Sequence, residues 1–246
     1  MIRRYVTALP VYNEVAHVDR VLDEVLRYSD DVLVIDDGST DGTSERLTAR
    51  GDVQVIRHEP NRGYGAGLIS AFDYAQREGY DVLVTIDCDG QHEPKRIPQF
   101  VAKLDETGAD IVSGSRYLQA FPGDTAPPEQ RRAINVRITE QLEELLGLSL
   151  TDSFCGFKAY RVEALRDLCL TEPGYAMPLE FWVQAVAHEL KIVELPVPLI
   201  YLDEKRSFGV SLDDADRRFA YYQEVLQRAM RQAQRMEGVL LDQEHS

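Results

Sequence analysis

Cysteine, tryptophan and long apolar runs are scarce in this sequence of 246 residues. Its three cysteines, Cys88, Cys155 and Cys169, form no C-x-x-C pair and no Cys/His spacing typical of a metal site. We therefore expect reduced thiols rather than a disulfide scaffold. No apolar run approaches the roughly 18 residues that a membrane-spanning helix requires, and no charged and apolar leader precedes the first predicted strand. The expected location is the cytoplasm, and a peripheral position at the membrane face stays open.

Basic residues are also scarce, because 27 lysines and arginines stand against 42 aspartates and glutamates. The net charge of −15 argues against the basic surface that nucleic-acid binding needs, so we predict no nucleic-acid partner. It also argues against polybasic docking on an anionic membrane. The rest of the composition, 44% hydrophobic and 28% charged, is that of a globular protein with one large α/β domain or two small ones.

Short apolar runs alternate with stretches of helical periodicity over residues 1–116. We expect strands at residues 3–9, 31–36, 53–58, 81–87 and 109–117, with a helix after each of the first four. The first strand should end at Pro10, and the first helix should begin at Asn13 or Glu14. Four β-α repeats with short connections predict an α/β fold, with a mostly parallel, doubly wound sheet in three α/β/α layers.

This alternation ends after Tyr117, where residues 118–130 form a loop rich in Pro and Gly, a candidate mobile lid. Beyond it we expect helices at 131–146, 162–168 and 178–190, strands at 154–160, 191–197 and 198–202, and an amphipathic helix from Asp213 or Asp214 to about Met236. We divide the chain into one domain, 1–211, with halves 1–116 and 117–211, and a C-terminal helix and tail, 212–246. That helix could pack on its own domain, form a homodimer or lie on a bilayer.

A pair of carboxylates follows the fourth predicted strand, where the apolar run Val82 to Ile86 ends in Asp87 and then Asp89. Open α/β sheets bind ligands at the carboxyl ends of their strands. Oxygen ligands of this kind suit Mg²⁺ or Mn²⁺, whose shell substrate phosphates often complete. Aspartates at strand ends also serve as loop and helix-capping residues, so the pair alone leaves both readings open.

Several motifs at the same predicted edge together resemble the family 2 glycosyltransferases of GT-A fold. They are LPVYNE (9–14), DDGSTDGT (36–43), NRGYGAGL (61–68), DCDGQH (87–92) and GSRY (114–117). Two later motifs, TDSFCGFK (151–158) and RSFGVS (206–211), are similar to those of the dolichyl- or polyprenyl-phosphate mannose and glucose synthases. The resemblance covers about residues 3–211.

On the donor side, the resemblance implies a nucleoside diphosphate sugar, GDP-mannose or a UDP-sugar. Pro10 would shape the turn after the first strand, and Tyr12 would stack on the base. Glu14 would accept hydrogen bonds from ribose or base, unless it is only a first-turn helix carboxylate.

Three further residues complete this expected donor site. Asp36 would bind the base edge, whereas its neighbour Asp37 is expected to shape the turn. Gly63 and Gly65 would line the nucleotide pocket or, alternatively, let the helix pack closely on its neighbours.

The resemblance also implies the metal and phosphate ligands. Asp87, Asp89 and Gln91 would hold Mg²⁺ or Mn²⁺, and Arg116 would bind the donor diphosphate or else form a salt bridge with a carboxylate. One arginine of the pair Arg131 and Arg132 would bind donor or acceptor phosphate.

Arg206 and Ser211 would bind the acceptor phosphate, although Leu212 stands where these synthases usually have a lysine.

The reaction implied is displacement with inversion at the anomeric carbon. A polyprenyl or dolichyl phosphate is already largely dianionic near pH 7, since its second pKa is about 6, and needs little base assistance. A hydroxyl acceptor needs a base, for which Asp152 and Glu180 are the candidates. The predicted catalytic residues are therefore Asp89, Asp152 and Arg116.

Two other functions stay open on the sequence alone. A soluble family 2 transferase could act on a small-molecule, glycan or protein hydroxyl, and the acidic composition favours it. A non-catalytic module with an acidic pocket, similar to a response-regulator receiver, is disfavoured by the chain length and by the later motifs. A sugar nucleotidyltransferase would need a Gly-rich loop where this chain has LPVYNE.

Overall fold

The computed structural model of the chain describes residues 4–202 and 214–244. The strands within these residues are β1 (Tyr5–Val11), β2 (Val32–Asp36), β3 (Gln54–Arg57), β4 (Val82–Thr85), β5 (Ile111–Ser115), β6 (Lys158–Arg161) and β7 (Ile192–Pro196). The α-helices are α1 (Val18–Val25), α2 (Thr43–Ala49), α3 (Tyr64–Arg77), α4 (Ile97–Thr107), α5 (Glu129–Leu146), α6 (Met177–Ala187) and α7 (Ala215–Glu244). Two short 3₁₀ helices are η1 (Pro94–Arg96) and η2 (Val162–Leu165).

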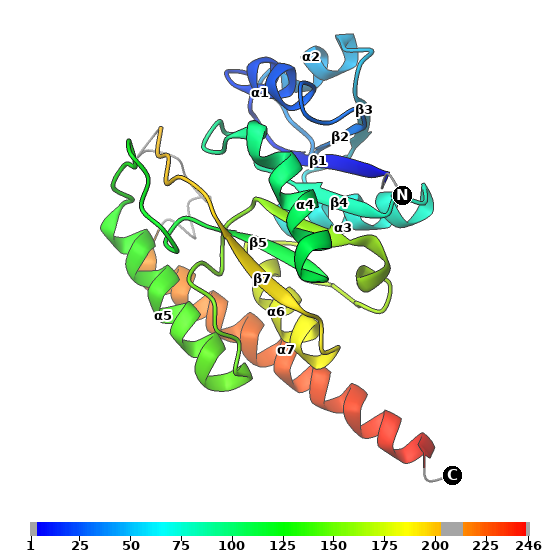
Figure 1. Cartoon of the computed structure of the whole chain (residues 1–246), viewed down its shortest axis with the longest axis vertical. Coiled ribbons are helices and arrows are strands. Elements are labelled where there is room, and N and C mark those ends of the chain that lie inside the picture. The colour runs from blue at the N-terminus through cyan, green and yellow to red at the C-terminus, as the bar shows by residue number, and fades with distance from the viewer. Residues whose placement is uncertain (1–3, 203–213, 245–246) are drawn as a thin grey trace.

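The strands form one seven-stranded sheet in the order β3-β2-β1-β4-β6-β5-β7 (Figure 1). Every neighbouring pair is parallel except the two made by β6, which runs antiparallel between β4 and β5. The predicted α/β class and the mostly parallel sheet are confirmed. Since β1, β2, β4 and β5 run in one direction, their carboxyl ends meet at one edge of the sheet.

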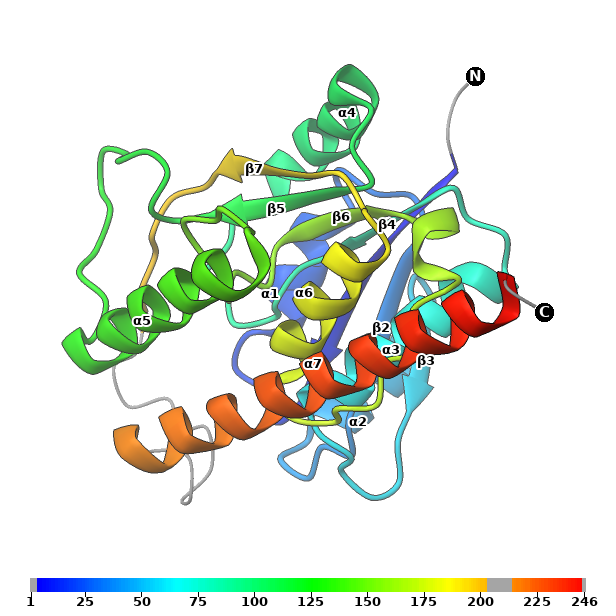
Figure 2. The same cartoon turned by 90° about the horizontal axis from the view of Figure 1, so that it is seen from below.

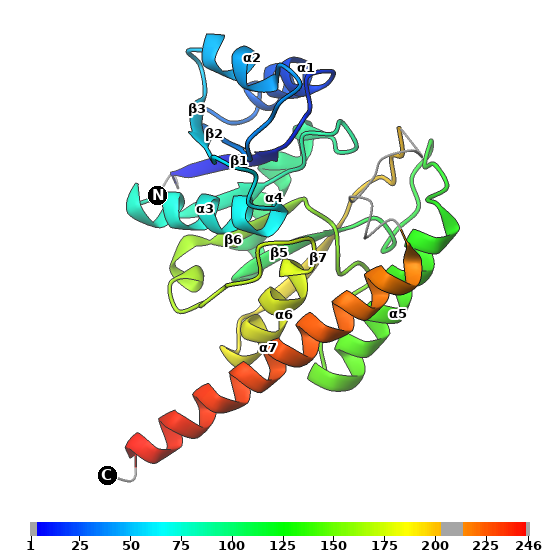
Figure 3. The same cartoon turned by 180° about the vertical axis from the view of Figure 1, so that it is seen from behind.

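Helices cover both faces of the sheet, as the views in Figures 2 and 3 show. One hydrophobic core lies between the sheet and helices α3, α5, α6 and α7, and the other lies between the sheet and helices α1, α2 and α4. Strands such as β4, buried at every position, therefore have apolar side chains on both faces. This is the predicted three-layer arrangement.

Several local predictions differ from the structure, among them the helix predicted at 162–168, which is the 3₁₀ helix η2, and the last helix, which extends to Glu244. β1 continues through Pro10 to Val11, beyond the predicted end of the strand. On the β4 side, pairing with β1 extends only as far as Ala8 and Thr85. The nitrogen of Pro10 faces this unpaired side of β1. Because proline has no N–H there, no hydrogen bond between strands is lost.

The first helix begins at Val18 rather than at Asn13 or Glu14. Asn13 has a φ of 56° and its side-chain oxygen accepts from the Thr40 N–H, so it belongs to the turn. Residues 198–202 are not a strand, because Leu199 bonds with the loop at Asp124 and Thr125 instead of with the sheet.

The C-terminal helix α7 packs on the domain itself. Its side chains Tyr222, Val225, Leu226 and Ala229 are buried against α6 and α5. In Figures 1 and 3 it runs beside α5 and then extends beyond the sheet. Among the described helices, none joins the length and the apolar character needed to cross a bilayer.

Candidate functional site

The acidic turn after β4 places Asp87 and Asp89 at the carboxyl edge of the sheet. The Asp87 side chain is 27% exposed and its Oδ1 accepts a hydrogen bond from the Tyr64 hydroxyl at 3.0 Å. Its Oδ2 lies 3.5 Å from His92 Nε2. The Asp89 carboxylate accepts the Gln91 backbone N–H at 2.9 Å, which closes the turn.

Two features of this turn fit a divalent cation. A Cβ at Gly156 would lie 2.2 Å from the Asp87 carboxylate, so only glycine leaves room for that carboxylate at the sheet edge. His92, whose Nε2 faces Asp87, has its other ring nitrogen, Nδ1, buried without a hydrogen-bond partner among the described atoms. Within residues 4–202 and 214–244 no three acidic, histidine or cysteine side chains gather into a metal cage. Two carboxylates suit Mg²⁺ or Mn²⁺ when donor phosphates supply the other oxygens.

On the nucleotide side, Tyr12 at the end of β1 is 47% exposed, so its ring is available for stacking. Glu14 is buried, and its backbone N–H donates to the Thr43 hydroxyl. Asp36 is also buried, and its two oxygens accept from the Ser39 N–H and the Ser44 hydroxyl. Asp36 therefore also holds its own turn, and its contact with a base edge stays a prediction.

Asp37 shapes the neighbouring turn, as the sequence predicted. Its carboxylate accepts the N–H groups of Arg62 and Gly63 at 2.9 and 2.8 Å and bonds His58 Nδ1 at 2.6 Å. A Cβ at Gly63 would lie 2.3 Å from the Pro173 carbonyl oxygen.

Gly65 is packed in the same way, since its Cβ would lie 2.4 Å from the Glu172 carbonyl oxygen. Both glycines thus allow close packing against residues 172–174, and their contact with a nucleotide stays a prediction.

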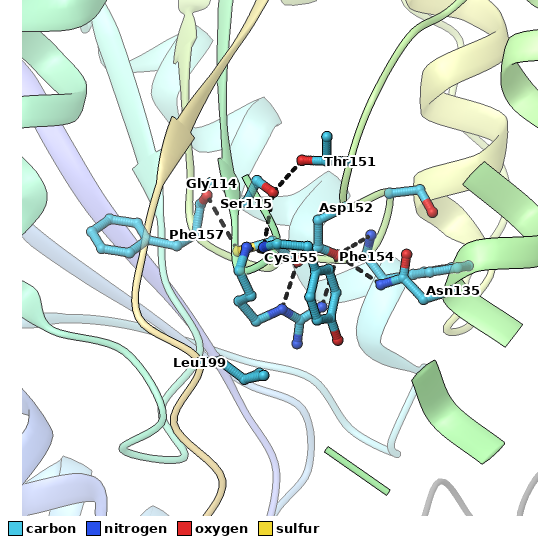
Figure 4. Close-up of polar contacts among 12 residues, drawn as sticks. Gly114, Ser115, Asn135, Thr151, Asp152, Phe154, Cys155, Phe157 and Leu199 are labelled. Atoms are coloured by element: carbon cyan, nitrogen blue, oxygen red, sulfur yellow. Dashed lines mark hydrogen bonds and ion pairs between the residues drawn. The ribbon is translucent and has the colours of Figure 1, made fainter. Parts of the chain in front are cut away.

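At the end of β5, Arg116 forms a bidentate pair with Asp152, with Nε and Nη2 at 2.6 and 2.9 Å from the two carboxylate oxygens. Asn135 donates to the same carboxylate at 2.8 Å, and Figure 4 shows Asp152 enclosed by these contacts. Burial by itself would raise the pKa of Asp152, but the charge and hydrogen bonds of Arg116 outweigh it and lower the pKa to about 2. Asp152 is thus buried and paired with Arg116, and its role as a general base stays a prediction.

Glu180, the other candidate base, is also buried. It accepts hydrogen bonds from the Thr171 hydroxyl and from the N–H groups of Thr171 and Glu172. Asp152 and Glu180 therefore both make hydrogen bonds that stabilise the fold.

Two arginines contact the ring of Tyr117, and a third, Arg131, contacts Tyr201 instead. The guanidinium of Arg132 stacks 3.6 Å from the Tyr117 ring centroid, and that of Arg116 lies 5.6 Å from it. Arg131 donates to the Tyr201 hydroxyl at 3.1 Å. Arg206 and Ser211, predicted to bind acceptor phosphate, lie outside the described residues.

The loop from Asp152 to Gly156 links the two halves of the site, because it contacts Arg116 at one end and Asp87 at the other. Beneath it, Lys158 donates to the Cys155 carbonyl oxygen and is buried. Burial lowers the pKa of Lys158, while Cys155, Asp152 and Asp87 oppose that shift.

Sequence reasoning missed three residues that hold this site. Tyr64 contacts Asp87, Asn135 contacts Asp152, and Glu194 accepts the N–H groups of Thr151 and Asp152. Burial raises the pKa of Glu194. Tyr64 lies within a quoted motif, but no local pattern marks Asn135 or Glu194.

An open α/β sheet with two aspartates after β4 and an arginine after β5 at its carboxyl edge defines a class of α/β protein suited to anionic ligands. The family described as glycosyl transferase family 2 matches residues 7–169. The chain belongs to this family and is a glycosyltransferase.

Relatives of known name cover most of the chain. The polyprenol monophosphomannose synthase of Mycolicibacterium smegmatis is 32% identical over 221 residues, covering 85% of this chain and 80% of the relative. The undecaprenyl-phosphate mannosyltransferase of Micrococcus luteus is 31% identical over 208 residues, covering 80% and 84%.

Among solved structures, the glucosyl-3-phosphoglycerate synthase of Mycobacterium tuberculosis, in complex with Mn²⁺, UDP and glucosyl-3-phosphoglycerate, has a TM-score of 0.71. The match covers 93% of this chain and 80% of that chain at 21% identity. This likeness confirms the predicted GT-A fold.

Proposed function

We propose that the protein transfers a sugar, with inversion, from a nucleoside diphosphate sugar to a polyprenyl phosphate in a reaction that requires Mg²⁺ or Mn²⁺. The observation that carries the proposal is the loop from Asp152 to Gly156, which pairs with Arg116 at one end and lies against the Asp87 carboxylate at the other. The names of relatives at 31–32% identity, which act on polyprenol and undecaprenyl phosphates, support it.

On the donor side, Asp87 and Asp89 would hold the cation, and Gln91 would complete its protein ligands. When bound, the cation would act as a Lewis acid on the departing nucleoside diphosphate. Tyr12 would stack on the base. Arg116, held in a fixed orientation by Asp152, would stabilise the negative charge that develops on the diphosphate.

On the acceptor side, a phosphate oxygen would form the new bond to the anomeric carbon while the bond to the diphosphate breaks. One arginine of the pair Arg131 and Arg132 would bind this phosphate, with Arg206 and Ser211 as further ligands. A hydroxyl acceptor is disfavoured because Asp152 and Glu180 are both buried and already hydrogen-bonded. Since Asp152 orients Arg116, Asp152→Asn would reduce activity with either acceptor and does not distinguish them.

The test is a transfer assay with radiolabelled GDP-mannose or UDP-glucose, undecaprenyl phosphate in detergent, and Mn²⁺ or EDTA. We expect an organic-extractable, acid-labile product with one donor, formed only with metal. Asp89→Asn should lower its rate at least a hundredfold, whereas Asp167→Asn, an exposed control, should not.

A thermal-shift panel of GDP and UDP with and without Mn²⁺ would identify the base. No metal-dependent stabilisation by either nucleotide would contradict the donor site. Binding of a nucleotide together with transfer to a hydroxyl acceptor, and none to the lipid phosphate, would contradict the acceptor assignment alone.

A further inference from the structure

Tyr64 is the first residue of α3, and its side chain reaches across to the acidic turn after β4. Its hydroxyl donates to Asp87 Oδ1 at 3.0 Å. A tyrosine hydroxyl has an ordinary pKa near 10, so it is a donor at neutral pH. The other carboxylate oxygen, Oδ2, lies on the His92 side, 3.5 Å from His92 Nε2.

The Tyr64 ring is itself fixed by a second tyrosine. The rings of Tyr64 and Tyr175 are stacked, with centroids 5.7 Å apart and planes 15° from parallel. Two tyrosine rings in this arrangement restrict each other's side-chain rotation. The Tyr64 hydroxyl therefore has a defined position relative to Asp87.

The segment that carries Tyr175 is held from several sides. The carboxylate of Glu172 contacts the Tyr221 hydroxyl and the Arg228 guanidinium of α7, and it accepts the Gly174 N–H at 2.9 Å. The Pro173 carbonyl oxygen accepts the Ala66 N–H at 3.1 Å, which ties this segment back to α3. An unbroken series of contacts thus runs from α7 to Asp87.

We propose that Tyr64 is a positioning residue for the metal-binding carboxylate, holding Asp87 in the orientation that binds the cation and the donor diphosphate. This inference rests on the proposed function, because it needs Asp87 to be a metal ligand. Hydrogen bonds to ligating carboxylates fix their orientation, and their loss typically costs about 10- to 100-fold in metal affinity. Tyr64 does not touch the sugar or the acceptor in this role.

The test is Tyr64→Phe, which keeps the stacked ring and removes only the hydroxyl. Mn²⁺ binding is measured in the presence of GDP or UDP by the electron paramagnetic resonance signal of free Mn²⁺, a readout independent of catalysis. We expect the Kd for Mn²⁺ to rise about 10- to 100-fold. The matched control is Tyr74→Phe, another stacked tyrosine of α3, whose ring partner is Tyr80 and which should leave the Kd unchanged.

In the transfer assay the apparent KM for Mn²⁺ should rise for Tyr64→Phe, while kcat at saturating Mn²⁺ falls much less. A purely structural role would instead lower the melting temperature of the metal-free protein without this split. Tyr175→Leu removes the stacking ring and keeps the Tyr64 hydroxyl, and it should also raise the Kd for Mn²⁺. If Tyr64→Phe does not fold, the Kd of Tyr175→Leu tests the inference in its place.

An unchanged Kd in Tyr64→Phe, with wild-type protein that binds Mn²⁺ and nucleotide, would overturn this inference and leave the proposed function standing. Wild-type protein that binds no Mn²⁺ with either nucleotide would overturn both. Equal increases in Kd for Tyr64→Phe and Tyr74→Phe would also overturn it, since the effect would then not depend on contact with Asp87.

Discussion

Asp152 lies out of solvent with its carboxylate between Arg116 and Asn135. An ionised carboxylate is costly to bury unless a cation and hydrogen bonds compensate for lost hydration. The bidentate guanidinium and the amide supply both. The pair thus keeps Arg116 oriented at the end of β5, and Arg116 keeps Asp152 ionised.

We expect Asp152→Asn to destabilise the protein by about 3 kcal/mol, because it leaves the partly buried Arg116 without its counter-charge. The pKa of Asp152 is lowered from 3.8 in the unfolded chain to about 2 in the folded protein. Its contribution is therefore fully present above pH 4 and is lost as the pH falls through about 2. The free-energy difference between wild type and variant should shrink over that window.

Urea unfolding at a series of pH values measures this difference, with Asp167→Asn as an exposed control. A difference that stays constant from pH 5 to pH 2 would contradict the assigned pairing.

At the scale of elements, His58 joins three of them at the nucleotide edge. It follows β3, bonds Asp37 after β2 at 2.6 Å, and lies 2.9 Å from the Ser70 hydroxyl of α3. His58 and Asp37 are both buried, so the hydrogen bond between them lies out of solvent. The turn at Arg62 and Gly63, which Asp37 also holds, depends on the same carboxylate.

We expect His58→Ala to destabilise the protein by about 1–3 kcal/mol, because a buried carboxylate and a hydroxyl each lose a partner. Gln54→Ala, an exposed change on β3, should have an effect within about 0.5 kcal/mol. Chemical denaturation gives both values. Equal effects of the two substitutions would mean that the His58 contacts contribute nothing to stability.

The parts of the fold that sequence could predict are those encoded locally. The apolar run of β4 followed by Asp87, and the glycines and aspartates of the turn after β2, mark their positions by residue type alone. The prediction that the first strand ends at Pro10 was wrong. Whether a strand can contain proline depends on where the neighbouring strand, here β4, stops pairing with it.

Contacts between distant segments could not be predicted in the same way. Residues 198–202 resemble a strand, yet Leu199 pairs with the loop at Thr125, 74 residues away. The link from Tyr64 to Tyr175, and the placing of Asp152 against Arg116, likewise depend on tertiary packing. The hydrogen bonds that Asp36 makes within its own turn were not predicted either, while its contact with a base stays a prediction.

At the scale of the whole molecule, α7 belongs to the same folded unit as the sheet. The apolar stripe predicted from its sequence is covered by α6 and α5, so this face is not available to a bilayer or a second copy. On the same helix, Tyr221 and Arg228 contact Glu172, whose backbone packs against Gly65 of α3. The division of the chain at residue 212 stays a prediction, but these contacts indicate cooperative folding.

Leu226→Ala removes a fully buried side chain from the α7 interface. A loss of about 2–5 kcal/mol is expected from the cavity, which corresponds to a fall of roughly 5–15 °C in the melting temperature of the entire chain. Gln227→Ala, exposed on the next position of the helix, should leave that temperature nearly unchanged. Calorimetry should show one transition for all three proteins, because α7 and the sheet share a core. If α7 were instead an independent appendage, the main transition would keep its wild-type midpoint in Leu226→Ala.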